Sequence, residues 1–200
     1  MTVAVEGDDS WMFQIPATEI SRLQAQAMGI EHHLITVSGE SEVEVEQLLS
    51  GLQPLIVSKS IDGLVSGALR SEYQRRRLDG VCEELNIHSF TPLWHNDPEQ
   101  HMRELIDCGM EMMLVSVSCE GLEEDWLGKV VNGTNFEQLL ALSKEYRFNI
   151  DGEGGEFETA ILSGPHMDGR IELDSVQSWN NNRGHLEILS MSLNDVDATE

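Results

Sequence analysis

An α/β fold that changes character in its second half is predicted from three features of the sequence. Short apolar strand patterns alternate with helical patterns from the N-terminus to about residue 120, which is typical of a parallel sheet covered by helices. Two helices in this region have well-marked starts. Nearer the C-terminus, two strand patterns flank a run of turn-forming residues instead.

Four segments of the first part have the short, apolar character of buried strands, at residues 3–5, 34–37, 63–66 and 112–117. Between them, apolar residues recur at helical spacing. One such stretch begins near Ile20 and stops at Gly29, and another begins at Glu42. The strands and helices therefore alternate, which predicts a parallel sheet covered by helices.

The two well-marked helix starts lie at Ser71 and Asp97. Ser71 is followed three residues later by Gln74, the spacing of a capping box. Asp97 precedes Pro98, which favours the first position of a helix because its missing N–H group has no helical partner there. We expect Ser71 and Asp97 to be the N-caps.

The second half is predicted to contain one more helix and a pair of strands. The helix covers residues 136–146, and the glycine- and glutamate-rich stretch 151–159 follows in a loop. Strand patterns at 169–173 and 186–190 lie on either side of the turn-forming run 180–184. This half therefore resembles an α+β domain.

The charge of the chain is strongly acidic. It has 36 acidic residues against 12 basic residues and a formal net charge of -24. Binding to nucleic acid requires clustered cations, so the composition argues against a nucleic-acid-binding protein. Only three of the basic residues are lysines. Such acid excess suits a cytoplasm rich in salt, and we expect a halophilic, archaeal source.

Other compositional features point to a cytoplasmic protein. No apolar run reaches the length of a membrane span, and the first ten residues do not resemble a signal peptide. The three cysteines show no CxxC pairing, and their odd number argues against a disulfide framework. We expect no membrane partner, while the oligomeric state, including a homo-oligomer, stays open.

Two segments are candidates for chemistry, since no P-loop, GxGxxG, HExxH or GxSxG signature is present. The first is Ser66–Arg77, where a strand end, a glycine and a helix N-terminus follow one another. Anions bind at such positions in α/β sheets. The alternative is that Ser71 and Gln74 only cap the helix and that the arginines form a solvated face.

The second candidate is Asp151–Thr159, with the sequence DGEGGEFET. Its glycines permit positive φ angles, and successive N–H groups can form an anion-binding nest. Its glutamates could hold Mg²⁺ or take a proton during attack on a carbonyl group. The alternative is an acidic turn in a protein that is acidic throughout.

Together, four motifs resemble the diphthine–ammonia ligase family of N-type ATP pyrophosphatases, in the PP-loop superfamily. They are GALRSEYQRRR, TPLW, EGLEEDWLGK and GEGGEFET, in that order. The resemblance runs from about Gly7 to Ile188. It implies a Rossmann-like (HUP-type) parallel sheet with helices on both faces, followed by a smaller α+β substrate domain. We place the nucleotide-binding domain at residues 1–90 and the substrate domain at 91–200.

The resemblance implies ATP-dependent amidation, with ATP and Mg²⁺ as cofactors and ammonia and elongation factor 2 as partners. The carboxylate of diphthine is adenylated, pyrophosphate leaves, and ammonia displaces AMP to give diphthamide. An alternative is the same chemistry on another carboxylate.

The family motifs carry over residue by residue. Glu153 and Glu156 are implied as catalytic residues, with no protein metal site. Residues implied in nucleotide or substrate binding are Gly67, Ser71, Tyr73, Gln74, Arg77, Gly154, Gly155 and Thr159.

One part of the family pattern is absent from this sequence. Family members begin with a strand and an S-G-G-K-D-S loop, whereas residues 3–5 and the loop 6–13 correspond to the family's second strand and its following loop. In a sheet of order 3-2-1-4-5, losing strand 1 separates strands 2 and 4. We expect an upstream start, a second chain that supplies the loop, or a relative that binds a partner without ATP chemistry.

Overall fold

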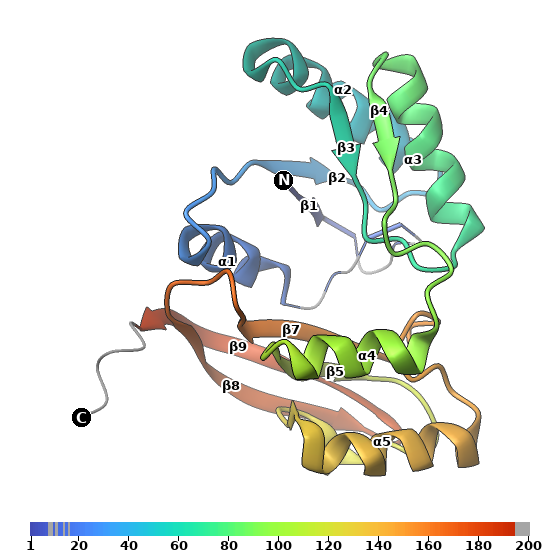
Figure 1. The fold of residues 1–200 in the computed structure, drawn as a ribbon, viewed down its shortest axis with the longest axis vertical. Coiled ribbons are helices and arrows are strands. Elements are labelled where there is room, and N and C mark those ends of the chain that lie inside the picture. Colours follow the sequence, from blue (N-terminus) through green and yellow to red (C-terminus); the bar gives the residue numbers. More distant parts are fainter. Residues whose placement is uncertain (8–9, 11, 14, 16, 195–200) are drawn as a thin grey trace. The chain divides into compact units, whose positions relative to one another are not determined.

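The computed structural model describes residues 1–7, 10, 12–13, 15 and 17–194, and these residues form a mixed α/β protein. They divide into two compact units. Unit 1 comprises residues 1–15 and 33–96, and unit 2 comprises residues 16–32 and 97–200. Figure 1 labels the helices and strands of the two units. In the loop 6–13, positions 8, 9 and 11 lie outside the described residues.

Unit 1 is built from parallel strands and two long helices. Its elements are β1 Thr2–Val5, β2 Leu34–Val37, α2 Val43–Lys59, β3 Gly63–Val65, α3 Glu72–Glu84 and β4 His88–Phe90. β1 pairs with β2, and β3 pairs with β4, both in parallel. Within the described residues these pairs form two separate two-stranded sheets.

The core of unit 1 lies where α2 and α3 pack on the β1–β2 pair. It contains Val3, Ile35, Val37, Leu48, Leu52 and Val81. Leu48 and Val37 are almost completely buried. Gly51 permits the close approach of α2 to β2, because a Cβ atom there would lie 2.6 Å from Cγ2 of Ile35. The helix from Glu42 and the strand at 34–37 are as the sequence predicts.

Unit 2 is an antiparallel sheet with helices packed on it. Its helical elements are η1 Thr18–Ile20, α1 Ser21–Ala27, α4 Pro98–Asp107, η2 Glu124–Trp126 and α5 Gly133–Tyr146. Its strands are β5 Glu111–Val117, β6 Val130–Val131, β7 Phe157–Ser163, β8 Arg170–Asn180 and β9 Arg183–Asn194. They run in the order β6-β5-β9-β8, and β7 pairs with β5.

The direction of β5 differs from the sequence prediction. The alternation of strand and helix places residues 112–117 in the parallel sheet, but β5 pairs antiparallel with β6, β7 and β9. Periodicity along one strand reports its burial and not the direction of its neighbours. The sequence pattern of residues 112–117 therefore cannot distinguish parallel from antiparallel pairing. The parallel part of the fold therefore ends at β4.

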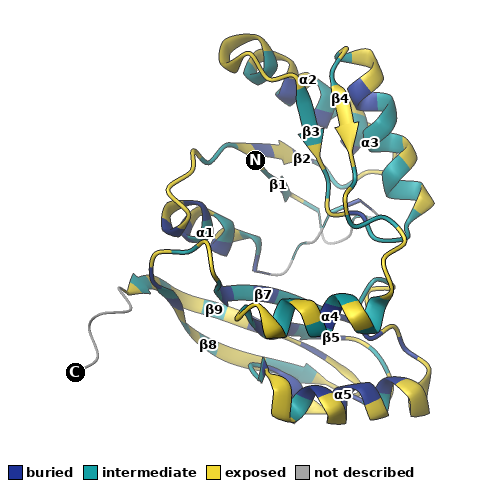
Figure 2. Ribbon diagram, viewed as in Figure 1, coloured by how far each residue is buried: buried dark blue, intermediate teal, exposed yellow. Residues whose placement is uncertain are grey.

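A segment from the N-terminal part of the chain completes unit 2. Ala17, Ile20 and Leu23 belong to the same core as Leu114, Val115 and Phe136. The Gln24 side chain donates a hydrogen bond from Nε2 to the carbonyl oxygen of Ile161 on β7, at 2.9 Å. The backbone N–H of Asp168 donates to the carbonyl oxygen of Ala27 at 2.7 Å. Figure 2 shows buried, intermediate and exposed residues along α1.

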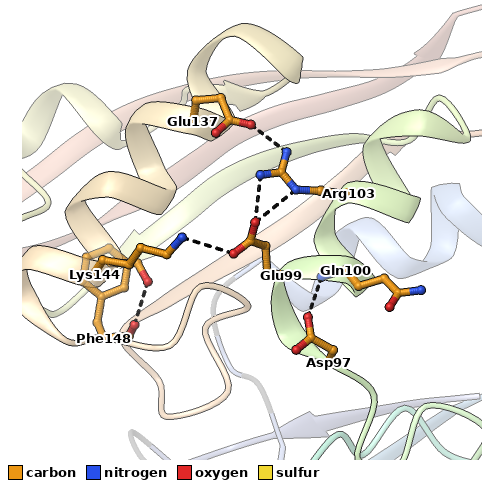
Figure 3. Close-up of polar contacts among 8 residues, drawn as sticks. Asp97, Glu99, Gln100, Arg103, Glu137, Lys144 and Phe148 are labelled. Atoms are coloured by element: carbon orange, nitrogen blue, oxygen red, sulfur yellow. Dashed lines mark hydrogen bonds and ion pairs between the residues drawn. The ribbon is translucent and has the colours of Figure 1, made fainter.

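An ion-pair network connects α4 with α5 (Figure 3). Arg103 contacts Glu99 at 2.9 Å and Glu137 at 2.6 Å, and Lys144 contacts Glu99 at 3.3 Å. Hydrogen bonds from Arg103 hold the pKa of Glu99 and of Glu137 below the ordinary value of 4.5. All four side chains are solvent-accessible, so the network fixes helix orientation more than it adds stability.

Both predicted N-caps are confirmed. Ser71 accepts a hydrogen bond from the N–H group of Gln74 at 3.3 Å, and Asp97 accepts one from the N–H group of Gln100 at 2.9 Å. The pair of strands near the C-terminus is also confirmed, although β8 and β9 extend well beyond the predicted ranges. Among the described residues, no helix has the length and apolar character needed to cross a membrane.

Candidate functional site

In unit 1, the candidate residues gather beyond the carboxyl end of β3. Gly67 follows the strand, and a Cβ atom built there would meet nothing within 4 Å. The strand's pairing continues one residue further, because the N–H of Ser66 donates to the carbonyl oxygen of Phe90 at 2.9 Å. The backbone is thus held rigidly up to an open position, which suits the approach of a ligand.

The first turn of α3 contacts the loop that follows β1. Ser71 caps the helix, but Gln74 does not complete the capping box. Its Nε2 donates instead to the carbonyl oxygen of Met12 at 3.2 Å. Gln74 therefore connects the first turn of α3 with the loop that follows β1, a contact that sequence spacing alone does not reveal.

Tyr73 and Arg77 contact the loop that follows β2. The guanidinium of Arg77 lies 3.3 Å from the centroid of the Tyr73 ring. Arg77 also forms an ion pair with Glu42, and the Tyr73 hydroxyl lies 3.0 Å from Oγ of Ser41. Four of the five motif residues predicted in unit 1 therefore sit on α3 or at its N-cap, in contact with loops after β1 and β2.

These contacts bear on the implied cofactors ATP and Mg²⁺. The N-terminus of α3, the largely buried side chain of Arg77 and the open position at Gly67 fit an anionic, phosphate-bearing ligand. No group of three or more His, Cys, Asp or Glu residues capable of holding a metal occurs in the described part of the chain.

In unit 2, the predicted loop is a closed turn stabilised by its own side chains. Asn149–Glu156 contains two short backbone hydrogen bonds, from the N–H of Gly152 to Asn149 and from the N–H of Gly155 to Gly152. Gly152 and Gly155 have φ angles of 71° and 75°, which non-glycine residues rarely adopt. At Gly152 a Cβ atom would also lie 2.5 Å from the carbonyl oxygen of Phe157.

The carboxylate of Glu156 lies inside this turn. Its Oε1 accepts hydrogen bonds from the N–H and the side-chain amide of Asn149, at 3.0 and 2.7 Å. Its Oε2 accepts from the N–H of Gly154 at 2.8 Å. Gly154 needs to be small here, because a Cβ atom would lie 2.8 Å from that carboxylate. The loop's own Glu156 is therefore held by one N–H group of the glycine run together with Asn149, and not by the successive N–H groups that the sequence predicts.

The turn is also attached to β5. The N–H of Ser118 donates to the carbonyl oxygen of Glu156 at 2.8 Å, and its hydroxyl donates to that of Gly155 at 2.5 Å. β7 begins immediately afterwards, with Thr159 opposite Leu114. The N–H of Glu153 contacts Oδ1 of Asp151 at 3.4 Å. All five motif residues predicted in unit 2 thus lie in this turn or at the start of β7.

The structure adds Glu158, which sequence analysis did not select. This residue lies on β7 within the motif, in register with Ser116 of β5, and its side chain is partly buried. Its Oε2 is buried without a hydrogen-bond partner, and burial raises the pKa of the carboxyl group to about 7. The position of Glu158 beside the EGGE run is a signal that could have found it. The sequence cannot show, however, that the carboxylate of Glu156 already accepts hydrogen bonds within the turn.

Comparisons with known proteins show the family of this chain. Residues 1–89 match the diphthamide synthase N-terminal domain, and residues 97–193 match the diphthamide synthase C-terminal domain. A diphthine–ammonia ligase from Rattus norvegicus is 34% identical over 188 residues, covering 87% of this chain and 70% of the relative. The Homo sapiens diphthine–ammonia ligase is 34% identical over 179 residues, covering 84% and 67%. This chain belongs to the diphthine–ammonia ligase family.

The match to a more distant relative covers a smaller part of that relative's length. The diphthine–ammonia ligase of Schizosaccharomyces pombe is 28% identical over 177 residues, which are 82% of this chain and 29% of that protein. These three relatives are eukaryotic, so they lend no support to the expected archaeal, halophilic source. That expectation stays a prediction.

Proposed function

We propose that this protein amidates the diphthine residue of elongation factor 2 to diphthamide. ATP activates the diphthine carboxylate as an acyl-adenylate with release of pyrophosphate. Ammonia then forms the C–N bond as AMP leaves. The observation that carries the proposal is that both family motifs form ordered sites, one beyond β3 in unit 1 and one before β7 in unit 2.

Unit 1 acts in this proposal as the nucleotide-binding domain. Gly67, Ser71, Tyr73, Gln74 and Arg77 lie on or beside the N-terminal turns of α3, where positive charge from the helix dipole and the guanidinium favours phosphate groups. Mg²⁺ would neutralise charge on the phosphates that transfer. The open position at Gly67 allows the ligand to approach the backbone.

Unit 2 acts as the substrate-binding domain. Gly154, Gly155 and Thr159 shape the surface beside the diphthine carboxylate, and Glu153 is the loop's proposed catalytic carboxylate. Glu156 acts through the loop, because its two oxygens already accept three hydrogen bonds. Replacing Glu156 with Gln is therefore expected to lower turnover by changing the loop's shape.

The direct test incubates the protein with ATP, Mg²⁺, ammonium chloride and elongation factor 2 that carries diphthine. The expected result is one AMP and one pyrophosphate for each diphthamide, detected by mass spectrometry of the modified peptide. Omitting ammonium should stop amide formation. Glu172→Gln serves as a matched control, because this exposed carboxylate lies on β8 outside both motifs.

Three other outcomes would contradict the proposal or change it. AMP formation with a different carboxylate but not with diphthine would assign the same chemistry to another acceptor. Absence of ATP binding, measured by calorimetry with intact protein, would favour a relative that binds a partner without ATP chemistry. A second chain that restores AMP formation when added would point to a shared nucleotide site.

A further inference from the structure

Two buried carboxylate oxygens lack a hydrogen-bond partner among the described residues, and only one of them lies beside a family motif. They are Oε1 of Glu44 and Oε2 of Glu158. Glu44 is fully buried and accepts a hydrogen bond from Ser10 through its other oxygen, at 2.7 Å. Glu158 accepts no hydrogen bond in the described structure, and the residue is partly exposed although its Oε2 is buried.

The residue opposite Glu158 on the adjacent strand β5 is Ser116, which is polar and uncharged. Ser116 on β5 is in register with Glu158 on one side and with His185 of β9 on the other. Residues in register across antiparallel strands project from the same face of the sheet. Glu156, two residues earlier, is held by Asn149 and Gly154. No lysine or arginine is among the groups that shift the Glu158 pKa, whose cause is burial alone.

A carboxylate in this position is costly to keep charged without a partner. It can take up a proton, or it can meet a small cation that donates hydrogen bonds. Mg²⁺ fits poorly, because it prefers several oxygen ligands in octahedral geometry and the described residues place no group of three or more potential metal ligands at Glu158. Ammonium carries its charge on a compact group with four N–H donors, one of which the Glu158 carboxylate can accept.

We propose that Glu158 binds ammonium and takes up its proton, delivering ammonia for the amidation. This inference rests on the proposed function for the identity of the nitrogen substrate. It assigns nitrogen binding to Glu158, whose carboxylate accepts no hydrogen bond from the turn. Glu156 remains a positioning residue for the loop.

The step balances in atoms and charge. Ammonium transfers one proton to the Glu158 carboxylate, which leaves neutral ammonia and a carboxylic acid. The nitrogen lone pair forms the C–N bond at the acyl carbon, and the bond from that carbon to the AMP oxygen breaks, so AMP leaves with the electron pair. The excess proton on nitrogen passes to solvent, and Glu158 later releases its own proton to solvent.

The first test measures ammonium binding directly and needs no ATP. Carboxyl groups of the intact chain, labelled with ¹³C-glutamate, are titrated by NMR between pH 4 and 9. One signal that titrates near neutral pH is expected, absent from Glu158→Gln and retained in Glu172→Gln. Saturating ammonium chloride should lower its apparent pKa by about 1 pH unit, as expected for a cation at contact distance, whereas tetramethylammonium chloride of equal ionic strength should not.

An equal response to the two salts, or no carboxyl signal that titrates near neutral pH, would overturn the inference. Circular dichroism checks that Glu158→Gln folds. If it does not, Glu158→Asp replaces it, and the shorter side chain should weaken the response to ammonium.

The second test separates the inference from the proposed function. Glu158→Gln should raise the KM for ammonium at least about tenfold, while ATP–pyrophosphate exchange with diphthine-bearing elongation factor 2 stays unchanged. Loss of exchange in the wild-type protein contradicts the proposed function, and the NMR titration still decides ammonium binding. Normal exchange with an unchanged KM for ammonium contradicts the role of Glu158 alone.

Discussion

Replacing Glu158 with Gln should stabilise the protein at neutral and alkaline pH and leave its stability unchanged in acid. Burial raises the pKa of Glu158 to about 7 from an ordinary value of 4.5. Below pH 4.5 the group is protonated in both the folded and the unfolded state. As the pH rises from 4.5 through 7, the unfolded state loses its proton first, so the folded wild-type protein loses stability. Gln does not titrate and escapes this loss.

The size of the effect follows from the difference between the two pKa values. At about 1.36 kcal/mol per pH unit, it corresponds to roughly 3 kcal/mol for a fully desolvated group. Glu158 is partly exposed, and solvent screening reduces the expected gain to about 1–2 kcal/mol. For a protein of this size that is a rise in Tm of about 3–6 °C.

The assay is thermal or urea unfolding of both proteins at fixed ionic strength, at pH 4, 5, 6, 7 and 8.5. The difference in the free energy of unfolding should be near zero at pH 4 and should grow until about pH 7.5. Glu172→Gln should show no such growth, because its carboxylate is exposed. A constant difference between Glu158→Gln and the wild type across this range would refute the reasoning about burial.

Four further substitutions test other parts of unit 2. Gly152→Ala should cost about 2–3 kcal/mol in urea unfolding, because its positive φ and its contact with Phe157 both disfavour a side chain. Gly155→Ala, with a similar φ but open space, should cost about 1 kcal/mol; equal costs would contradict this steric account. Asn132→Ala removes the N-cap of α5 and should cost about 1 kcal/mol, seen also as faster amide exchange in the first turn; unchanged exchange would show that the cap is dispensable. Arg103→Met should lower the Tm in dilute buffer but not in molar salt, since its ion pairs are solvent-accessible; a loss that persists in high salt would indicate packing instead of charge.

Local signals in the sequence predicted local structure well. The caps at Ser71 and Asp97 use side-chain hydrogen bonds within three residues, so residue type and spacing are sufficient to find them. The strand at Leu34–Val37 is found because its apolar run lies between clear helical patterns. The two-residue strand β6, by contrast, exists only through its pairing with β5, and no pattern of its own marks it.

Features that depend on distant contacts were not predictable. Gln74 completes no capping box because Met12, 62 residues away, offers a carbonyl oxygen. Which glutamate near the EGGE run is already hydrogen-bonded depends on which carboxylate the backbone of the turn encloses. The motif pattern selects Glu156 and passes over Glu158, and only the folded turn shows which of the two carboxylates already accepts hydrogen bonds.

The segment that carries α1 has a consequence for folding during synthesis. The hydrogen bond from Gln24 to Ile161 joins residues 137 positions apart, and Ala17 and Ile20 lie in a core whose other members are mostly beyond residue 100. At about 5–20 residues per second on the ribosome, this segment waits on the order of ten seconds for its partners. During that time its apolar side chains are available to a chaperone, and the second unit cannot complete its core until synthesis is nearly finished.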